Sequence, residues 1–326
     1  MSLTEALISH QLEISGASIS LVLLGAYLDI PFFKKFIILE GEQPNGTYVK
    51  AFNDVYFVIF CFAFVTFVRT FLMELIFVPF IKKRGIRSKI KVDKFKEQSF
   101  SVVFYIISWS VGCYLLYHSP YWFSTSQIWI GYPHFELSPG TKKFYLFQLG
   151  YWLQQMVYVQ IEVRRKDYLN MIVHHIITNL LLILSYYCNF TRAGHIILTL
   201  MDFSDIFLSL VKVFNYLKLS VLCDMTFVVF VLSWFFTRHV GYMILIWSIL
   251  VDPLKYNSAK WDPANGIYFT EAVRIVFLAL LLPLQVLMIL WFKTILTILY
   301  RIFKGENMKD DRSSGDESPE EEKKEK

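Results

Sequence analysis

Long apolar runs alternate with short charged segments along most of this chain. A transmembrane helix needs about 20 mainly apolar residues to cross a hydrocarbon core of ~30 Å, and seven runs reach that length. An eighth run, 14–33, is weaker because it is only just long enough and contains Asp29 and Pro31. The seven runs lie near residues 53–80, 98–118, 144–162, 169–188, 195–214, 222–249 and 269–299. This pattern predicts an all-α, polytopic membrane protein, and we count 14–33 as an extra N-terminal span.

The composition agrees with a membrane protein. The 326 residues are 55% hydrophobic and 18% charged, which is more apolar than an ordinary soluble domain. The four cysteines lie in or beside apolar runs, without the close spacing of a zinc site or a disulfide framework. The N-terminus also lacks the basic segment and short apolar stretch of a cleavable signal. We therefore expect the spans themselves to direct insertion.

Basic residues predict the orientation, because short cytosolic loops carry an excess of Lys and Arg. The segment 81–96 holds eight basic residues and one acid, so we expect it on the cytosolic side. The segment "VRRKD", the turn "LKLS" and the C-terminal tail then also face the cytosol. The luminal loops are 34–52, 119–143, 189–194 and 251–268. The first of them carries a glycosylation sequon at Asn45.

These boundaries divide the chain into an N-terminal segment (1–13), a first span (14–33), a luminal loop (34–52), a membrane core (53–304) and a tail (305–326). The tail is acidic and too poor in apolar residues to build a core, which predicts a disordered cytosolic segment. Ser314 and Ser318 each have an acidic residue three positions on, so we identify them as candidate phosphorylation sites. A tail that only solvates the protein is the alternative. Its last four residues also match a dilysine signal, a pattern that arises easily by chance in a lysine-rich tail.

Two adjacent histidines interrupt the apolar run 169–188. Ionisable side chains inside a span are costly and by default mark a functional site. His174 and His175 lie ~10 Å below the charged cytosolic edge at a rise of 1.5 Å per residue. Thr178 follows His174 by four residues and shares its helical face. A polar stripe therefore extends into the membrane from the cytosolic side.

The next apolar run carries two aspartates, Asp202 and Asp205, on one helical face. The turn "CNFTRAG" joins the two runs into a tight helical hairpin. His174 and Asp205 are symmetric about its tip, which predicts imidazoles and carboxylates at nearly the same depth. A carboxylate within reach of an imidazole would fix its tautomer and raise its basicity. Such a cluster could also serve only to hydrogen-bond helices together, but we favour a chemical site.

The residue types restrict the chemistry of this site. A di-iron desaturase needs about eight histidines, and the chain has seven. The His-x-x-His-His box of fatty-acid elongases is interrupted by Met171. Zinc ligation by the two histidines and two aspartates remains open, although adjacent histidines point about 100° apart on a helix. Acyl transfer fits best, because an imidazole can act as base or nucleophile and a buried site excludes water.

The stretch from Arg164 to Tyr216 resembles the Lag motif of ceramide synthases, which belong to the larger TLC-domain family. The resemblance extends over about residues 46–304 and includes "IWIGYPH", "YWLQQ" and "TRH". Animal members often have histidine at the position of Met201 and glutamate at that of Ser209, so the chain is more similar to the fungal branch. The matching positions are Arg164, Arg165, Lys166, Asp167, Met171, His174, His175, Thr178, Ser185, Tyr186, Asn189, Arg192, Gly194, Asp202, Asp205, Lys212 and Tyr216. The resemblance implies a seven-helix TLC-domain core over 53–304, with the Lag motif at 164–216.

The resemblance also implies an activity, the N-acylation of a sphingoid base, sphinganine or phytosphingosine, by a fatty acyl-CoA. The enzyme would be a multi-pass protein of the endoplasmic reticulum membrane with a cytosolic C-terminus. A motif histidine would accept the acyl group, a role that we assign to His174, with His175, Asp202 and Asp205 tuning or moving protons. This chemistry needs no metal and no cofactor. The alternative is a non-catalytic TLC-domain protein for lipid sensing or trafficking.

Partners and substrate contacts follow from the same resemblance. Fungal members associate with a small single-span accessory subunit, and a homo- or hetero-dimer remains open. We expect no nucleic-acid partner, because the 81–96 loop is too short for the homeodomain-like insert of many animal members. Two groups of basic residues could each either bind substrate or have a structural role. They are Arg164, Arg165 and Lys166, which could bind the CoA phosphates, and Arg238 and His239, which could line a substrate tunnel.

Overall fold

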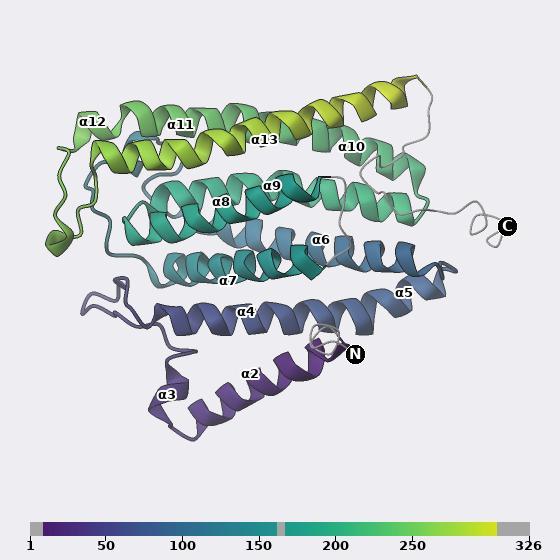
Figure 1. Cartoon of the computed structure of the whole chain (residues 1–326), viewed down its shortest axis with the longest axis horizontal. Coiled ribbons are helices and arrows are strands. Elements are labelled where there is room, and N and C mark those ends of the chain that lie inside the picture. The colour runs from purple at the N-terminus through teal and green to yellow at the C-terminus, as the bar shows by residue number, and fades with distance from the viewer. Residues whose placement is uncertain (1–8, 162–166, 305–326) are drawn as a thin grey trace.

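The computed structural model describes residues 9–161 and 167–304. Within these residues the chain forms helices joined by loops, and most of the helices run along the long axis of the molecule (Figure 1). Two of the segments are π-helical (η1 and η3) and two are 3₁₀ (η2 and η4). In chain order the elements are α2 (Gln11–Tyr27), α3 (Pro31–Lys34), α4 (Asp54–Phe71), η1 (Leu72–Phe77), α5 (Val78–Lys83), α6 (Lys89–Tyr117), η2 (Ser126–Ile128), α7 (Pro139–Ile161), α8 (Tyr168–Tyr187), α9 (Thr191–Tyr216), α10 (Ser220–Trp234), η3 (Phe235–Gly241), α11 (Tyr242–Val251), α12 (Pro253–Tyr256), η4 (Pro263–Asn265) and α13 (Glu271–Phe303).

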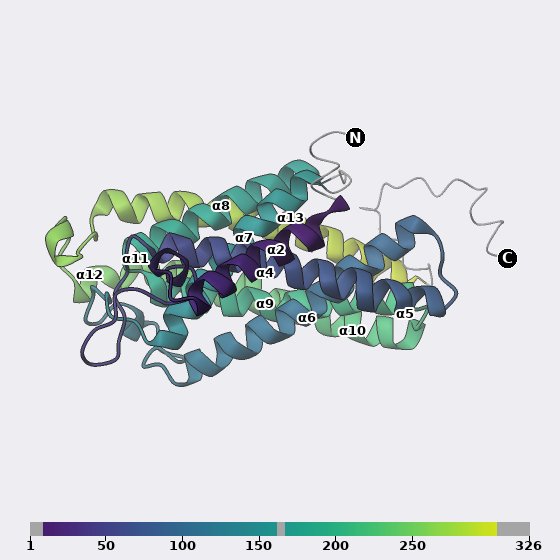
Figure 2. The ribbon, with the colours of Figure 1, turned by 90° about the horizontal axis from the view of Figure 1, so that it is seen from below.

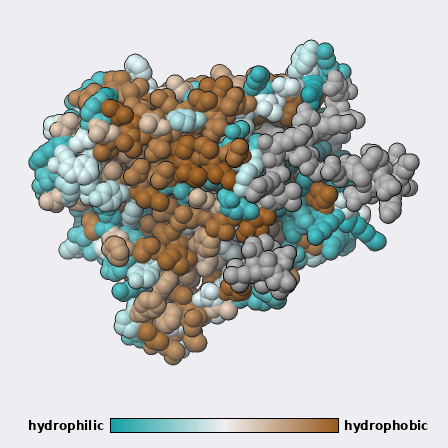
Figure 3. All heavy atoms as spheres, in the orientation of Figure 1, coloured by the Kyte–Doolittle hydropathy of each residue, from teal (hydrophilic) through white to brown (hydrophobic). Residues whose placement is uncertain are grey.

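The predicted all-α, polytopic membrane architecture is confirmed. Each of the seven long apolar runs is helical, and two of them continue through a π-helical turn into a second helix. Figure 3 shows hydrophobic side chains across the middle of the visible face and hydrophilic ones toward both ends. Five helices in the described part of the chain are long and apolar enough to cross a membrane. They cover Asp54–Lys83, Lys89–Tyr117, Tyr168–Tyr187, Ser220–Tyr256 and Glu271–Ile302.

The helices α7 and α9 are less apolar because they lie inside the bundle. α7 packs against α4 and α8, and α9 packs against α6 and α10. Neighbouring helices bury and satisfy polar groups that lipid would not tolerate. The most deeply buried of these polar side chains, each at most 1% exposed, are Lys142, Gln148 and Gln154 on α7 and His195, Asp202 and Ser204 on α9. An interior helix can therefore carry the polar residues of a site.

The two ends of the bundle differ in composition. The basic end comprises the α5–α6 loop, Arg84–Ser88, and the α9–α10 turn, Leu217–Leu219. The sequon end comprises the segments 35–53, 118–138 and 252–270, which include Asn45. α2 begins and α13 ends at the basic end (Figure 1). These are the ends that the charge pattern predicts to be cytosolic and luminal.

The predicted basic loop over 81–96 is too long. Only Arg84–Ser88 forms a loop, because α5 and α6 extend into the predicted segment from either side. Lys96 pairs with Asp93 one turn earlier, at 2.9 Å, and with Glu74 on η1, at 2.8 Å. These ion pairs stabilise the polar first turns of α6 beyond its apolar run. Most of the basic residues of the segment are therefore helical.

The weak N-terminal run 14–33 does not form one continuous helix. α2 has 17 residues, which is ~26 Å at 1.5 Å per residue. Asp29 then adopts a φ of 63°, which residues other than glycine rarely take, and Pro31 begins the short helix α3. These two residues therefore end α2 before the end of the predicted run at residue 33. Figure 2 shows α2 lying across α4, against which it packs.

A buried ion pair holds the loop before α4 against the bundle. Lys142 is fully buried, with its Nζ 2.7 Å from Asp54 Oδ1, and it donates to the carbonyls of Glu40 and Val49 at 2.7 Å each. The Tyr186 hydroxyl donates to Asp54 Oδ2 at 2.7 Å. Buried charges that are paired and fully hydrogen-bonded are tolerated inside a protein. This network fixes α4, α7 and α8 relative to one another at the sequon end.

Candidate functional site

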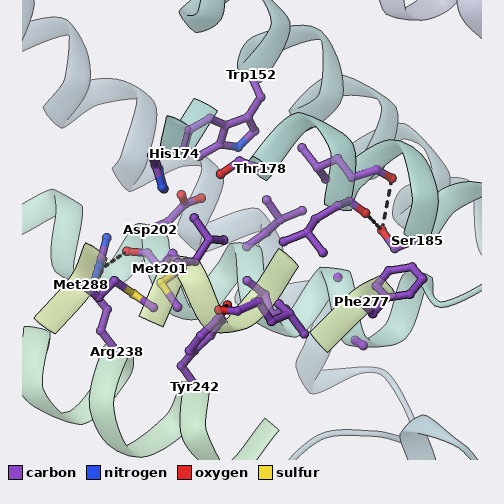
Figure 4. A pocket seen from close by; sticks show the side chains of 18 of the residues that line it. Trp152, His174, Thr178, Ser185, Met201, Asp202, Arg238, Tyr242, Phe277 and Met288 are labelled. Carbon is purple, nitrogen blue, oxygen red and sulfur yellow. Dashed lines mark hydrogen bonds between the residues drawn. The ribbon is translucent and has the colours of Figure 1, made fainter. Parts of the chain in front are cut away.

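A cavity of about 270 Å³ runs inside the bundle, lined mainly by α8, α9, α13 and the α10–η3–α11 helix. His174 and Asp202 lie at one end of it and Ser185 and Phe277 at the other (Figure 4). The lining residues of α13 reach from Trp291 to Arg274, which is ~26 Å along a helix. Most of the side chains along this length are aromatic or aliphatic. The cavity is therefore a long apolar chamber with a polar end.

His174 is held by edge-to-face contacts with neighbouring rings and makes no hydrogen bond within the described part of the chain. Its ring centre lies 5.7 Å from that of Trp152, 5.5 Å from that of Trp291 and 5.6 Å from that of His175. Its Nδ1 is buried without a partner. The residue lines the cavity, which leaves Nε2 as the nitrogen available to a ligand. A positioned imidazole without a hydrogen-bond partner is available for chemistry.

Asp202 is held by two side chains from other helices. Its Oδ2 accepts from Ser108 Oγ on α6 at 2.5 Å and from Gln148 Nε2 on α7 at 3.2 Å. Gln148 also donates to Ser108 at 2.6 Å. Asp202 is 1% exposed, so these donors replace the water that a carboxylate needs. Three helices thus fix this carboxylate at the polar end of the cavity.

Asp205 is paired with Arg238. Arg238 Nη2 donates to Asp205 Oδ1 at 2.8 Å, and Nη1 donates to Ser204 Oγ and to the Met201 carbonyl. The guanidinium also lies 4.1 Å above the Trp234 ring. Arg238 sits in the π-helix η3, and π-helical turns are frequent at functional sites. This ion pair closes the polar end of the cavity from the α9 side.

Comparisons with known proteins identify this architecture. A family model described as the TLC domain matches residues 94–297. The chain is 38% identical to the sphingosine N-acyltransferase lag1 of Schizosaccharomyces pombe over 90% of this chain and 75% of that protein. The chain belongs to the TLC-domain family, in its ceramide synthase branch. It is 37% identical to the ceramide synthase LAG1 of Saccharomyces cerevisiae, over 84% of this chain and 68% of that protein. It is 33% identical to the ceramide synthase FUM18 of Gibberella moniliformis, over 87% and 73%.

The TLC domain brings most of the predicted site residues to one cavity. His174, His175 and Thr178 line it from α8, Asp202 and Asp205 from α9, and Arg238 from η3. The hairpin turn between α8 and α9 is Cys188–Phe190, at the predicted place. Counting residues from this turn predicted imidazoles and carboxylates at a similar depth, and all four side chains line the one cavity.

His239 does not line the cavity, and of the two interpretations that the sequence left open the structure favours the structural one. Its Nδ1 is 2.9 Å from Gln285 Nε2, and its ring packs on Phe292 at 4.8 Å between centres. Adjacent helical residues point in different directions, and here Arg238 faces the cavity while His239 faces α13. His239 thus occupies a packing position against α13.

The carboxylates do not orient the imidazole of His174 directly. Asp202 is hydrogen-bonded to Ser108, Asp205 is paired with Arg238, and Nδ1 of His174 has no partner. Among residues 9–161 and 167–304, no three His, Cys, Asp or Glu side chains gather as metal ligands would. The donor geometry gives the zinc alternative no support.

The predicted glycosylation site, Asn45, does not line the cavity. Asn45 is on the exposed loop at the sequon end, where its Nδ2 donates to Glu136 at 2.9 Å and its Oδ1 accepts from Thr47. Several candidate positions lie outside the described residues, namely Arg164, Arg165, Lys166, Ser314 and Ser318.

Gly194 on α9 leaves room at the cavity wall for the Tyr145 side chain of α7. A Cβ at this position would collide with the Tyr145 hydroxyl, which is hydrogen-bonded to Ser185 Oγ on α8. All three residues line the cavity. Glycine therefore sets the width of the chamber at this level.

Proposed function

We propose that this protein is a ceramide synthase, which transfers a fatty acyl group from acyl-CoA to the amino group of a sphingoid base through an acyl-imidazole on His174. One observation carries the proposal. The ring of His174 has no hydrogen-bond partner in the described chain, and it lies at the polar end of a long apolar cavity. The names of the fungal relatives support the same activity, since they are N-acyltransferases and ceramide synthases.

In the first half-reaction Nε2 of His174 attacks the thioester carbonyl of the acyl-CoA. The carbon–sulfur bond breaks, CoA leaves as a thiolate, and this thiolate takes up the proton that the imidazole gives up. Trp152 and Trp291 keep the ring in place, and the apolar lining excludes water that would hydrolyse the acyl-imidazole. The acyl chain extends toward Phe277 in the apolar chamber.

In the second half-reaction the amino group of sphinganine or phytosphingosine attacks the acyl carbon. The carbon–nitrogen bond to His174 breaks, the amide bond forms, and the amine proton returns to the imidazole. We assign proton handling around the ring to His175, Asp202 and Asp205, which line the same cavity. An acyl-imidazole is already activated, so this route uses neither a metal nor a cofactor.

Incubation of the purified protein with acyl-CoA alone tests this route. We expect stoichiometric release of free CoA, about one per protein, and a mass increase equal to the acyl group on the tryptic or chymotryptic peptide that contains His174. Mass spectrometry of the peptide and a thiol assay measure the two products independently. Absence of CoA release without an amine, in a preparation that makes ceramide when both substrates are present, would contradict the covalent step.

We further propose a location in the endoplasmic reticulum membrane, with the basic end and the C-terminus in the cytosol. The eight basic residues in and beside the α5–α6 loop support this orientation. Asn45 is then luminal, where its exposed side chain can be glycosylated. By analogy with fungal members, we also propose a small single-span accessory subunit as a partner.

The change Asn45→Gln should remove one glycan from the protein made in a eukaryotic cell. The expected result is faster migration on a gel, equal to that of glycosidase-treated wild type. Thr47→Ser, which keeps the sequon, is the matched control and should migrate like the wild type. The proposed orientation would be wrong if the wild-type protein resisted the glycosidase and if protease added on the cytosolic side cut the loop that contains Asn45.

A purely lipid-binding TLC-domain protein is the alternative function. The apolar chamber alone would suit it, but the buried cluster of His174, His175, Asp202, Asp205 and Arg238 would not. Ionisable groups inside a membrane are costly, and holding an acyl chain requires none of them. The cluster therefore favours catalysis.

A further inference from the structure

A second, smaller pocket of about 160 Å³ lies beside the main cavity, toward the basic end. α4, α6, α7, α8 and α9 line it. About half of its wall is polar, a larger share than in the main cavity, and the polar side chains include Arg69, Glu97, Gln98, Ser101 and Ser209. Glu97 and Ser209 are seven or eight residues from the helix ends at the basic end, which is ~10–12 Å along a helix. The pocket is thus at the depth of the histidine pair.

The two pockets share part of their walls. His174 lines only the main cavity, whereas six residues line both, namely Tyr105, Gln155, Met171, His175, Asp205 and Leu208. A molecule in the second pocket is therefore separated from the acyl position only by these shared side chains. A molecule bound in the second pocket would approach the acyl group from this side, and not through the chamber that holds the acyl chain.

A buried arginine is fixed in this pocket. Arg69 is 5% exposed, and its guanidinium lies 3.7 Å from the centre of the Tyr158 ring and 5.9 Å from that of Phe100. An arginine inside a span marks a functional site by default. Arg69 is not among the site residues that we predicted from the sequence. Half-buried Glu97 on α6 adds a carboxylate to the same wall.

The chemistry of the wall fits a small head that carries an amine and hydroxyls. Glu97 attracts an amino group, and the amides and hydroxyls of Gln98, Ser101 and Ser209 can pair with hydroxyl groups. Asp205 also lies in this wall, paired with Arg238, whereas Asp202 lines only the main cavity. The phosphates of CoA carry several negative charges, for which a pocket with one arginine and a glutamate is a poor match.

We propose that this second pocket binds the polar head of the acceptor, a long-chain amino alcohol, while the acyl chain on His174 occupies the main cavity. The inference rests on the proposed acyl-imidazole route and adds the acceptor site to it. From this pocket the neutral amine attacks the acyl carbon past His175. The bond from the carbon to His174 breaks, the amide bond forms, and the amine proton passes to the imidazole.

Kinetics of Glu97→Gln test the proposal with sphinganine and acyl-CoA as substrates. The variant should raise the KM for sphinganine about tenfold or more, because a charged hydrogen bond to the amine is lost. The KM for acyl-CoA and the single-turnover release of CoA should stay at wild-type values. Glu74→Gln is the matched control, because Glu74 pairs with Lys96 outside both pockets and should leave both KM values unchanged.

Gln98→Leu provides a second variant, which tests recognition of the hydroxyl groups. Wild type should prefer sphinganine to octadecylamine, which has no hydroxyls, and the variant should lose most of that preference. An unchanged sphinganine KM in Glu97→Gln, or a raised KM for acyl-CoA instead, would overturn the acceptor assignment. Failure of CoA release in the wild type would refute the acyl-imidazole route, so the two failures are distinguishable. Normal CoA release in each variant shows that it is folded.

Discussion

Alanine in place of His174 should abolish amide formation while leaving the protein folded. We expect kcat/KM for ceramide formation to fall by more than ~10³-fold, because the substitution removes the group that accepts the acyl chain. Acylation by acyl-CoA alone should disappear as well. Product formation from acyl-CoA and sphinganine, followed by mass spectrometry in microsomes with matched expression levels, measures the loss.

His118→Ala is the matched control for this change. His118 is exposed at the end of α6, where its Nδ1 is 2.8 Å from the Tyr114 carbonyl, and it lines neither pocket. This variant should keep nearly full activity. Normal ceramide formation by His174→Ala would rule out the acyl-imidazole and favour a non-catalytic role for the cavity.

The change Arg238→Met should have the second large effect, on stability as well as on activity. Asp205 and Arg238 have side chains only 15% and 8% exposed, so the variant leaves a carboxylate buried without its cation. Breaking a buried pair in this way costs about 3–5 kcal/mol. Thermal unfolding in detergent should therefore begin at a clearly lower temperature. The polar end of the cavity should lose its catalytic arrangement at the same time.

A double variant separates these two effects. Arg238→Met combined with Asp205→Leu removes both charges, and it should recover most of the lost stability without recovering activity. Lys34→Met is the control, because Lys34 pairs with Asp29 at the surface, with side chains 38% and 85% exposed, and exposed pairs contribute at most about 1 kcal/mol. Equal unfolding temperatures for Arg238→Met and wild type would show that the ion pair does not stabilise the fold.

The sequence predicted the helices and the level of the site because both depend on distances along one chain. Apolar length located the seven runs, and counting from the α8–α9 turn placed His174 and Asp205 beside one cavity. The same approach overestimated the loop before α6 and took the N-terminal run as one span. Local ion pairs at Lys96 and the turn at Asp29 decide those boundaries, and hydropathy does not report them.

The partners of the site residues could not be predicted in this way. Ser108 and Gln148 hold Asp202 from helices 94 and 54 residues away in the sequence, and Arg238 lies 33 residues from Asp205. Such contacts depend on how each helix is rotated about its axis, which apolar length does not fix. The sequence identified Arg238 as an unusual buried charge, but it offered no means of choosing its partner. Ser108 and Gln148 gave no signal, since a serine or glutamine in a span is ordinary.

The contact between Gly194 and Tyr145 has a consequence for how this protein can evolve. A side chain at position 194 would displace the tyrosine that is hydrogen-bonded to Ser185, and so would narrow or distort the chamber. A substitution at position 194 would therefore change the space inside the chamber while His174 and its neighbours kept their places, so this position can alter which chains fit without altering the polar end.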